Sequence, residues 1–133
     1  MGVVTTMRIA LVYTSNWLSE YSDEGPDGEK VVSPVGAAVA DRAFKEAKQT
    51  IDKGRGPDFW VFNGGNGEER LEDGGRTKVI GLPGVVAKTY ATLEDYGDPD
   101  QWAEMYEPEI VQDLRVGLRG SRYKLTVMLA SDY

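Results

Sequence analysis

The chain has 133 residues, no cysteine, no histidine, and 22 acidic against 15 basic residues, for a net charge of −7. The missing cysteine excludes disulfides and thiolate chemistry, and the missing histidine excludes Ser-His and Cys-His triads. The acidic balance argues against general nucleic-acid binding, because phosphate contacts need clustered cations. The length suits a single globular domain over residues 1–133, in which we expect 1–6 to be a disordered leader.

The first half of the chain predicts a strand, a long loop and a helix. Residues 8–13 form a compact apolar run, which is typical of a strand. Residues 15–33 combine turn residues with charge and predict a long loop. The helix is predicted over 34–53, since apolar residues recur there about every four positions. Ser33 is suited to cap its start, and Gly54 to stop it.

A run of strands is predicted next. The four apolar residues 59–62 lie between turn signals and indicate a buried strand. Residues 68–72 and 76–82 flank Asp73-Gly74-Gly75, which is a hairpin signal. Residues 85–93 are expected to return as a further strand of this meander.

The last part of the chain predicts two helical pieces and a closing strand. Residues 98–101 have the Asp-Pro pattern that starts a helix. Pro108 is expected to interrupt this helix, and a second helical piece is predicted over 109–118. Residues 122–129 alternate between apolar and polar side chains, as in a strand with one buried face. The element order predicts an α+β fold: one domain with a mixed, largely antiparallel sheet and helices packed on one face.

Two loops are candidates for small-ligand binding. Residues 63–67, Asn-Gly-Gly-Asn-Gly, follow a buried strand, where backbone N–H groups can approach a phosphate. Glu68 and Glu69 come next and would repel phosphate, so a surface turn is the preferred interpretation. Thr14-Ser15-Asn16 loosely resembles the phosphate loop of flavodoxin-like proteins. That loop contains glycine and runs directly into a helix, and neither is predicted here.

The strongest feature of the sequence is charge segregation near its C-terminal end. An acidic segment without Lys or Arg is followed by a basic segment without acids. One interpretation is that the charges match the helix dipoles, and the other is a two-signed surface suited to head-to-tail contacts. The acids are Glu94, Asp95, Asp98, Asp100, Glu104, Glu107, Glu109 and Asp113, and the cations are Arg115, Arg119, Arg122 and Lys124.

Trp17, Leu18 and Tyr21 are apolar residues within the predicted long loop. Such side chains either fold back onto the core or anchor a partner. We therefore include Trp17 and Tyr21 with the charged segments as candidate partner-binding residues, and core cover is the slightly favoured alternative.

The layout from the helix onward resembles the small neck, or tail-completion, proteins of tailed phages, which are head–tail connectors. The resemblance rests on the helix 35–51, the strand 60–62, the strand 75–79 after a turn, and the final strand 124–129. It implies a helix, a sheet, a second helix and a closing strand. It also implies a ring of copies between portal and tail.

These observations predict a non-enzymatic structural or assembly protein that acts through protein–protein contacts or self-association, with a phage neck subunit as the specific expectation. The alternatives are a small-molecule or nucleotide-binding α/β domain, and an acidic inhibitor of a basic protein. We assign no catalytic, cofactor-binding or metal-binding residues. The chain has no apolar run long enough for a membrane and no recognisable signal peptide, so we expect it in the cytoplasm or in a virion.

Overall fold

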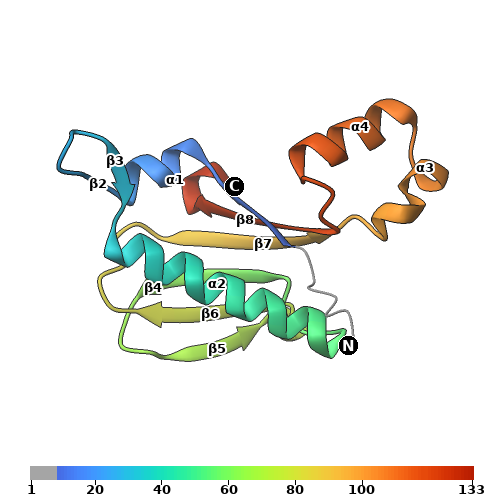
Figure 1. Ribbon diagram of the computed structural model, residues 1–133. Coiled ribbons are helices and arrows are strands. Elements are labelled where there is room, and N and C mark those ends of the chain that lie inside the picture. Colours follow the sequence, from blue (N-terminus) through green and yellow to red (C-terminus); the bar gives the residue numbers. More distant parts are fainter. Residues whose placement is uncertain (1–8) are drawn as a thin grey trace, which may run out of the picture.

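The computed structural model describes residues 9–133, over which helices and strands alternate along the chain (Figure 1). The strands are β1 (Ile9–Tyr13), β2 (Ser22–Glu24), β3 (Lys30–Val32), β4 (Phe59–Gly64), β5 (Glu69–Glu72), β6 (Thr77–Leu82), β7 (Thr89–Asp95) and β8 (Tyr123–Leu129). The α-helices are α1 (Ser15–Glu20), α2 (Pro34–Lys53), α3 (Trp102–Met105) and α4 (Pro108–Gly117), with short 3-10 turns at Asp73–Gly75, Pro99–Gln101 and Ala130–Asp132. The predicted leader 1–6, like Arg8, lies outside the described residues.

Six of these strands form one sheet in the order β1-β8-β7-β4-β6-β5. Neighbours pair antiparallel at β8–β7, β7–β4 and β6–β5, and parallel at β1–β8 and β4–β6. The predicted α+β fold with a mixed, largely antiparallel sheet is thus confirmed. The predicted meander is wrong in its strand order: β6 lies between β4 and β5 and runs parallel to β4, and β7 pairs with β4 and not with β6. The strand predicted over 85–93 begins later, at Thr89, and ends at Asp95. The tight turn at 73–75 forces β5 and β6 to pair, and β5 then occupies the sheet edge.

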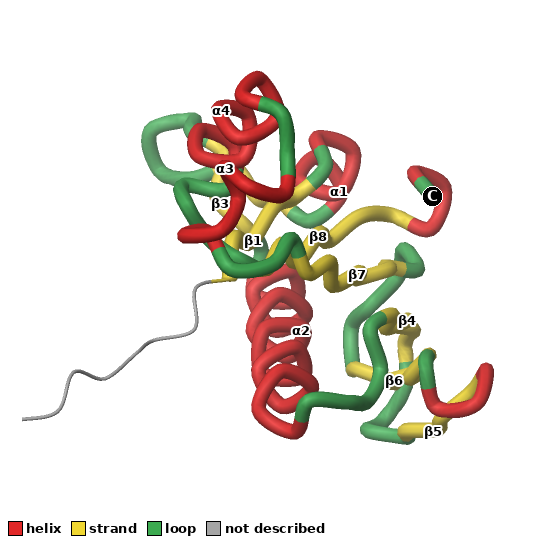
Figure 2. The backbone as a smooth tube through the Cα atoms, turned by 90° about the vertical axis from the view of Figure 1, so that its right-hand side faces the viewer, coloured by secondary structure: helices red, strands yellow, loops and turns green. Residues whose placement is uncertain are grey.

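Helix α2 covers one face of the sheet (Figure 2). Its start and end match the prediction: the Ser33 hydroxyl accepts a hydrogen bond from the Gly36 N–H at 3.1 Å, and Gly54 ends the helix in the left-handed conformation. Val39, Ala43 and Ala47 are fully buried on its inner face. They pack in one cluster with side chains of the sheet: Trp60, Phe62, Ile80, Ala91, Leu125 and Val127.

The long loop predicted over 15–33 is wrong, because this segment holds α1 and the hairpin β2–β3. Thr14 starts α1 by accepting a hydrogen bond from the Trp17 N–H at 3.3 Å. Trp17 and Tyr21 are four residues apart, and both join the main core. The turn residues and charges of the segment belong to the hairpin, where they face solvent.

Residues 99–118, here called the arm, have a small core of their own. Trp102 is fully buried against Leu114 and Leu118, and its indole Nε1 donates to the carbonyl of Tyr96 at 2.9 Å. Ala10 of β1 also packs there, which ties the arm to the sheet. In Figure 1, α3 and α4 lie beyond the end of β7, apart from α2. The arm is therefore an appendage of the sheet and not part of its main core.

Candidate functional site

The acidic and basic segments meet where β7 ends and β8 begins. The Arg122 guanidinium donates to both carboxylate oxygens of Asp95, with Nε–Oδ1 at 2.8 Å and Nη2–Oδ2 at 3.0 Å. This hydrogen bonding lowers the pKa of Asp95 and raises the pKa of Arg122. Glu94 lies opposite Lys124 in the same pair of strands. The predicted two-signed surface is therefore partly an ion-paired sheet end within one chain.

The Asp95–Arg122 pair gives a pH-dependent prediction. Because the folded-state pKa of Asp95 is lowered, its contribution to stability is present above the ordinary aspartate pKa, about 4. The contribution is lost as the pH falls through the lowered value. Arg122→Ala is expected to reduce the free energy of unfolding by about 0.5 kcal/mol at neutral pH, since both side chains are half exposed. Urea unfolding of both proteins from neutral to acidic pH measures this.

The free energies of unfolding of Arg122→Ala and the unchanged chain should converge at acidic pH, where the Asp95 carboxyl is protonated in both proteins. The matched control is Arg115→Ala, since Arg115 is exposed and makes no ion pair within residues 9–133. A loss for Arg122→Ala that stayed constant at every pH would contradict the ion-pair explanation.

The other acids of the predicted surface lie mainly on the arm. Asp98 accepts a hydrogen bond from the Asp100 N–H at 3.0 Å and starts the 3-10 turn, as the sequence predicts for a helix start. Within residues 9–133, no Lys or Arg nitrogen lies within 4.0 Å of the arm's carboxylates. The exposed acids of the arm are Asp100, Glu104, Glu107, Glu109 and Asp113.

Arg115 and Arg119 are exposed at the far end of α4 and in the loop after it. They are separated from Arg122 and Lys124, which lie in or beside β8. The basic segment is therefore divided between two places in the fold.

Trp17 and Tyr21 are core residues. Trp17 is fully buried, and its ring stacks between those of Tyr13 and Tyr21 with centroids 5.0 Å away on either side. Its Nε1 donates to the hydroxyl of Thr89 at 3.1 Å, and the Tyr21 hydroxyl donates to the carbonyl of Ala87. The assignment of Trp17 and Tyr21 to a partner-binding surface is therefore wrong, and core cover is confirmed.

The glycine turn 63–67 holds a carboxylate of its own chain. The Glu68 side chain accepts a hydrogen bond from the Asn66 N–H. Backbone N–H groups of Glu68 and Asn66 lower the pKa of this carboxyl. A Cβ added to Gly65 or Gly81 would lie 2.8 or 2.7 Å from a Glu68 oxygen, so these glycines leave room for the side chain. An internal anion thus takes the position that a phosphate would need.

Thr14, Ser15 and Asn16 lie at the start of α1 and not in a loop, so the prediction that no helix follows them directly is wrong. Two of these side chains bind a carboxylate of the chain. Thr14 donates to Asp132 Oδ2 at 2.8 Å, and Asn16 Nδ2 donates to Asp132 Oδ1 at 2.7 Å. These hydrogen bonds lower the pKa of Asp132. Thr14 and Asn16 therefore join the start of α1 to the 3-10 turn Ala130–Asp132, and a carboxylate occupies both side chains.

A network of four charges, which was not predicted from the sequence, joins α2 to the sheet edge. Glu46 is only 6% exposed and accepts from Lys78 Nζ at 2.9 Å and Arg42 Nε at 3.0 Å. Lys78 also reaches Glu69 at 3.0 Å. Burial lowers the pKa of Lys78, but hydrogen bonds to Glu46 and Glu69 outweigh it and raise the pKa overall. An acid on the otherwise apolar face of α2 was the signal for this network.

A cavity of about 670 Å³ lies beside this network, between the end of α2 and the β5–β6 hairpin; we call it the basic pocket. Its lining residues include four cations and one acid, and the acid is the Glu46 already bound by Lys78. Within residues 9–133, the other three cations have no carboxylate within 4.0 Å. These three cations are Lys53, Arg55 and Arg76.

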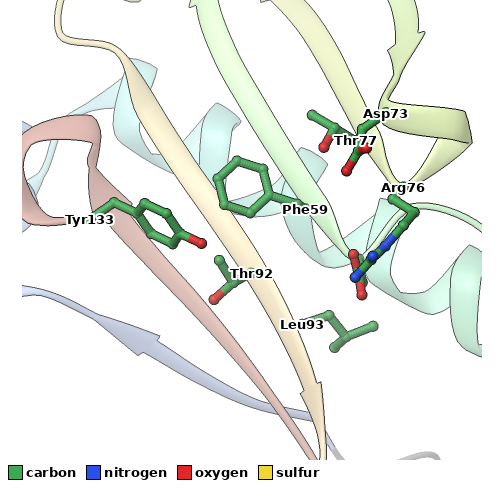
Figure 3. A pocket seen from close by; sticks show the side chains of 8 residues that line it. Phe59, Asp73, Arg76, Thr77, Thr92, Leu93 and Tyr133 are labelled. Atoms are coloured by element: carbon green, nitrogen blue, oxygen red, sulfur yellow. The ribbon is translucent and has the colours of Figure 1, made fainter.

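A second cavity, of about 430 Å³, lies on the side of Arg76 that faces β4 and β7. Figure 3 shows Asp73 and Arg76 on one side of it and Tyr133 on the other. The rings of Phe59, Tyr90 and Tyr133 lie 5.0–5.6 Å apart. This aromatic cluster packs the last residue of the chain onto the sheet.

Comparison of the chain with protein-family models, curated proteins and solved structures finds no match. Within residues 9–133, no three acidic side chains converge as a metal-binding group. None of the helices in that range has the length and apolar character needed to cross a bilayer. The arm has exposed acids without cation partners in residues 9–133, and the basic pocket has cations without acid partners there. These two features are the candidates for a functional surface.

Proposed function

We propose that this protein is a non-enzymatic assembly protein, which acts by associating with copies of itself. The proposal is based on the exposed surface of the arm. It presents exposed carboxylates without cation partners in residues 9–133, together with the exposed apolar side chains of Met105, Ile110 and Val116. Exposed apolar residues among charges are typical of surfaces that bind protein.

The form of the arm supports the same proposal. It has its own core, and only a few contacts join it to the sheet, through Ala10 and Tyr96. An appendage of this kind presents a surface away from the body of the molecule, where another protein can reach it. Within this class, the pattern resemblance to phage neck proteins favours a virion subunit that forms a ring.

The small-ligand alternative has less support. Both segments that suggested it bind a carboxylate of the chain: Glu68 accepts from the Asn66 N–H at the glycine turn, and Asp132 accepts from Thr14 and Asn16 at the start of α1. A phosphate there would have to displace a carboxylate or lie against it. The acidic-inhibitor alternative uses the same arm surface, and it predicts a monomer that binds a basic protein.

Sedimentation velocity over a range of protein concentrations tests the proposal. We expect the sedimentation coefficient to rise with concentration and the association to weaken with added salt, since charges flank the exposed apolar residues. A chain of 14.6 kDa that sediments as a monomer at every concentration would contradict self-assembly.

A further inference from the structure

We propose that the basic pocket binds the outer face of α4 of a second copy of this chain, so that copies join head to tail. This inference rests on the proposed function and names the two surfaces that would carry it.

The pocket is positioned by two turns that project cations into one place. Gly54 ends α2 in the left-handed conformation, and the Thr50 hydroxyl fixes the following turn by donating to the Pro57 carbonyl at 2.7 Å. Arg55 lies in that turn, with Lys53 just before it. Arg76 follows the 73–75 turn on the other side, and its carbonyl accepts from the Asp58 N–H at 3.1 Å. Three cations without ion pairs in residues 9–133 thus line one cavity in a chain of net charge −7. Arg55 and Arg76 also line two neighbouring cavities, which both contain Asp58.

The pocket also has an apolar side. Leu71 of β5 lines it and is 62% exposed, so its side chain is available to a partner that enters the pocket. A ligand that fits must therefore combine negative charge with an apolar group. Free phosphate lacks the apolar group, and the overall charge of the chain opposes a long polyanion such as nucleic acid.

The outer face of α4 has this combination. Leu114 and Leu118 point into the arm core, so helical spacing places Glu109, Asp113 and Val116 on the opposite side. Val116 is 68% exposed, and Ile110 beside this stripe is 45% exposed. Glu109 and Asp113 are four residues apart, so their Cβ atoms lie about 6 Å apart on one face and their carboxylates can meet two cations together.

The two surfaces cannot meet within one chain. The arm packs against β1 and the end of β7, whereas Leu71, Arg76 and Lys78 of the pocket lie in or beside β5 and β6 at the other edge of the six-stranded sheet. Arg55 lies nearer to the arm, because it also lines a cavity with Asp95 and Tyr123. At about 4.8 Å per strand, β1 and β5 are separated by about 24 Å. Each copy therefore offers one acidic face and one basic pocket, and a contact between them leaves a free surface of each kind for the next copy.

Charge reversal on each surface tests the inference. The acidic-face variant is E109R/D113R, and the pocket variant is K53E/R55E. Sedimentation velocity should show each variant alone associating at least tenfold more weakly than the unchanged chain, because like charges then face each other across the contact. An equal mixture of the two variants should associate again, because the unchanged acidic face of the pocket variant can meet the unchanged pocket of the acidic-face variant; a single chain with all four substitutions should also associate, with the charges exchanged across the contact.

Matched controls reverse the same number of charges elsewhere. E20R/D23R and K30E/K88E change exposed residues outside the arm and the pocket, and both should associate like the unchanged chain. If the unchanged chain associates and E109R/D113R and K53E/R55E associate equally well, the inference is overturned while the proposed function stands. Failure of the fourfold variant to associate, with its circular dichroism unchanged, would also overturn it. A monomeric unchanged chain would overturn both the inference and the proposed function.

Discussion

Replacing Trp17 with alanine is expected to lower the free energy of unfolding by about 3–5 kcal/mol, the range for deleting a buried aromatic side chain. Trp17 is fully buried between Tyr13 and Tyr21, and its indole N–H has a buried partner in Thr89. The substitution leaves a large cavity and removes the hydrogen bond that the Thr89 hydroxyl accepts, although this hydroxyl still donates to the Ala87 carbonyl at 3.2 Å. Since whole domains are stable by about 5–15 kcal/mol, this loss is a large part of the total.

Urea unfolding followed by tryptophan fluorescence measures the effect of Trp17→Ala, because Trp60 and Trp102 remain as probes. The control is Val86→Ala, since Val86 is 90% exposed and its loss should change stability by less than about 0.5 kcal/mol. If Trp17→Ala kept the stability of the unchanged chain but lost self-association, Trp17 would be a partner anchor and the packing described here would be wrong.

Replacing Trp102 with alanine should unfold the arm and leave the sheet folded. Trp102 is the fully buried residue of the arm core, and the main core lies in a separate cluster around Trp60 and Phe62. Regions with their own small core open locally at lower free energy than the whole domain. We therefore expect backbone amides of α4 to lose hydrogen-exchange protection, while those of β4 and β7 keep theirs.

The same substitution links the fold to the proposed function. With the arm unfolded, α4 no longer presents its acids on one face, and self-association should be lost. Met105→Ala is the control within the arm, because Met105 is 51% exposed and lies outside the arm core. Equal loss of protection in β4 and α4 would contradict a separable arm, and full association by Trp102→Ala would contradict its role in assembly.

Much of the fold could be predicted from local patterns. The helix at 34–53 has both caps and a regular apolar face, and β8 alternates cleanly, so each is specified by its own residues. The prediction of a long loop over 15–33 is wrong because it was based on the turn residues of the segment. The spacing of Trp17 and Tyr21, about one helical turn, places both rings in the core. The position of β6 between β4 and β5 depends on pairing between distant strands, which local patterns do not encode.

The candidate site was less predictable, since charges are paired by the fold and not by their order along the chain. Asp95 and Arg122 are 27 residues apart and become neighbours only when β7 pairs with β8. Arg55 and Arg76 both line the basic pocket, but they lie in two turns that are far apart in the sequence. A charge run in the sequence thus identified the acidic arm, but not the cations that complement it.

The mass of the unchanged protein in solution, measured by light scattering over rising concentration and at low and high salt, tests the central claim most directly. The account predicts a mass that grows beyond the 14.6 kDa of one chain as concentration rises, and that falls back toward it in high salt. A mass that stays at 14.6 kDa at every concentration and in low salt would contradict the claim that this protein acts by assembling with copies of itself.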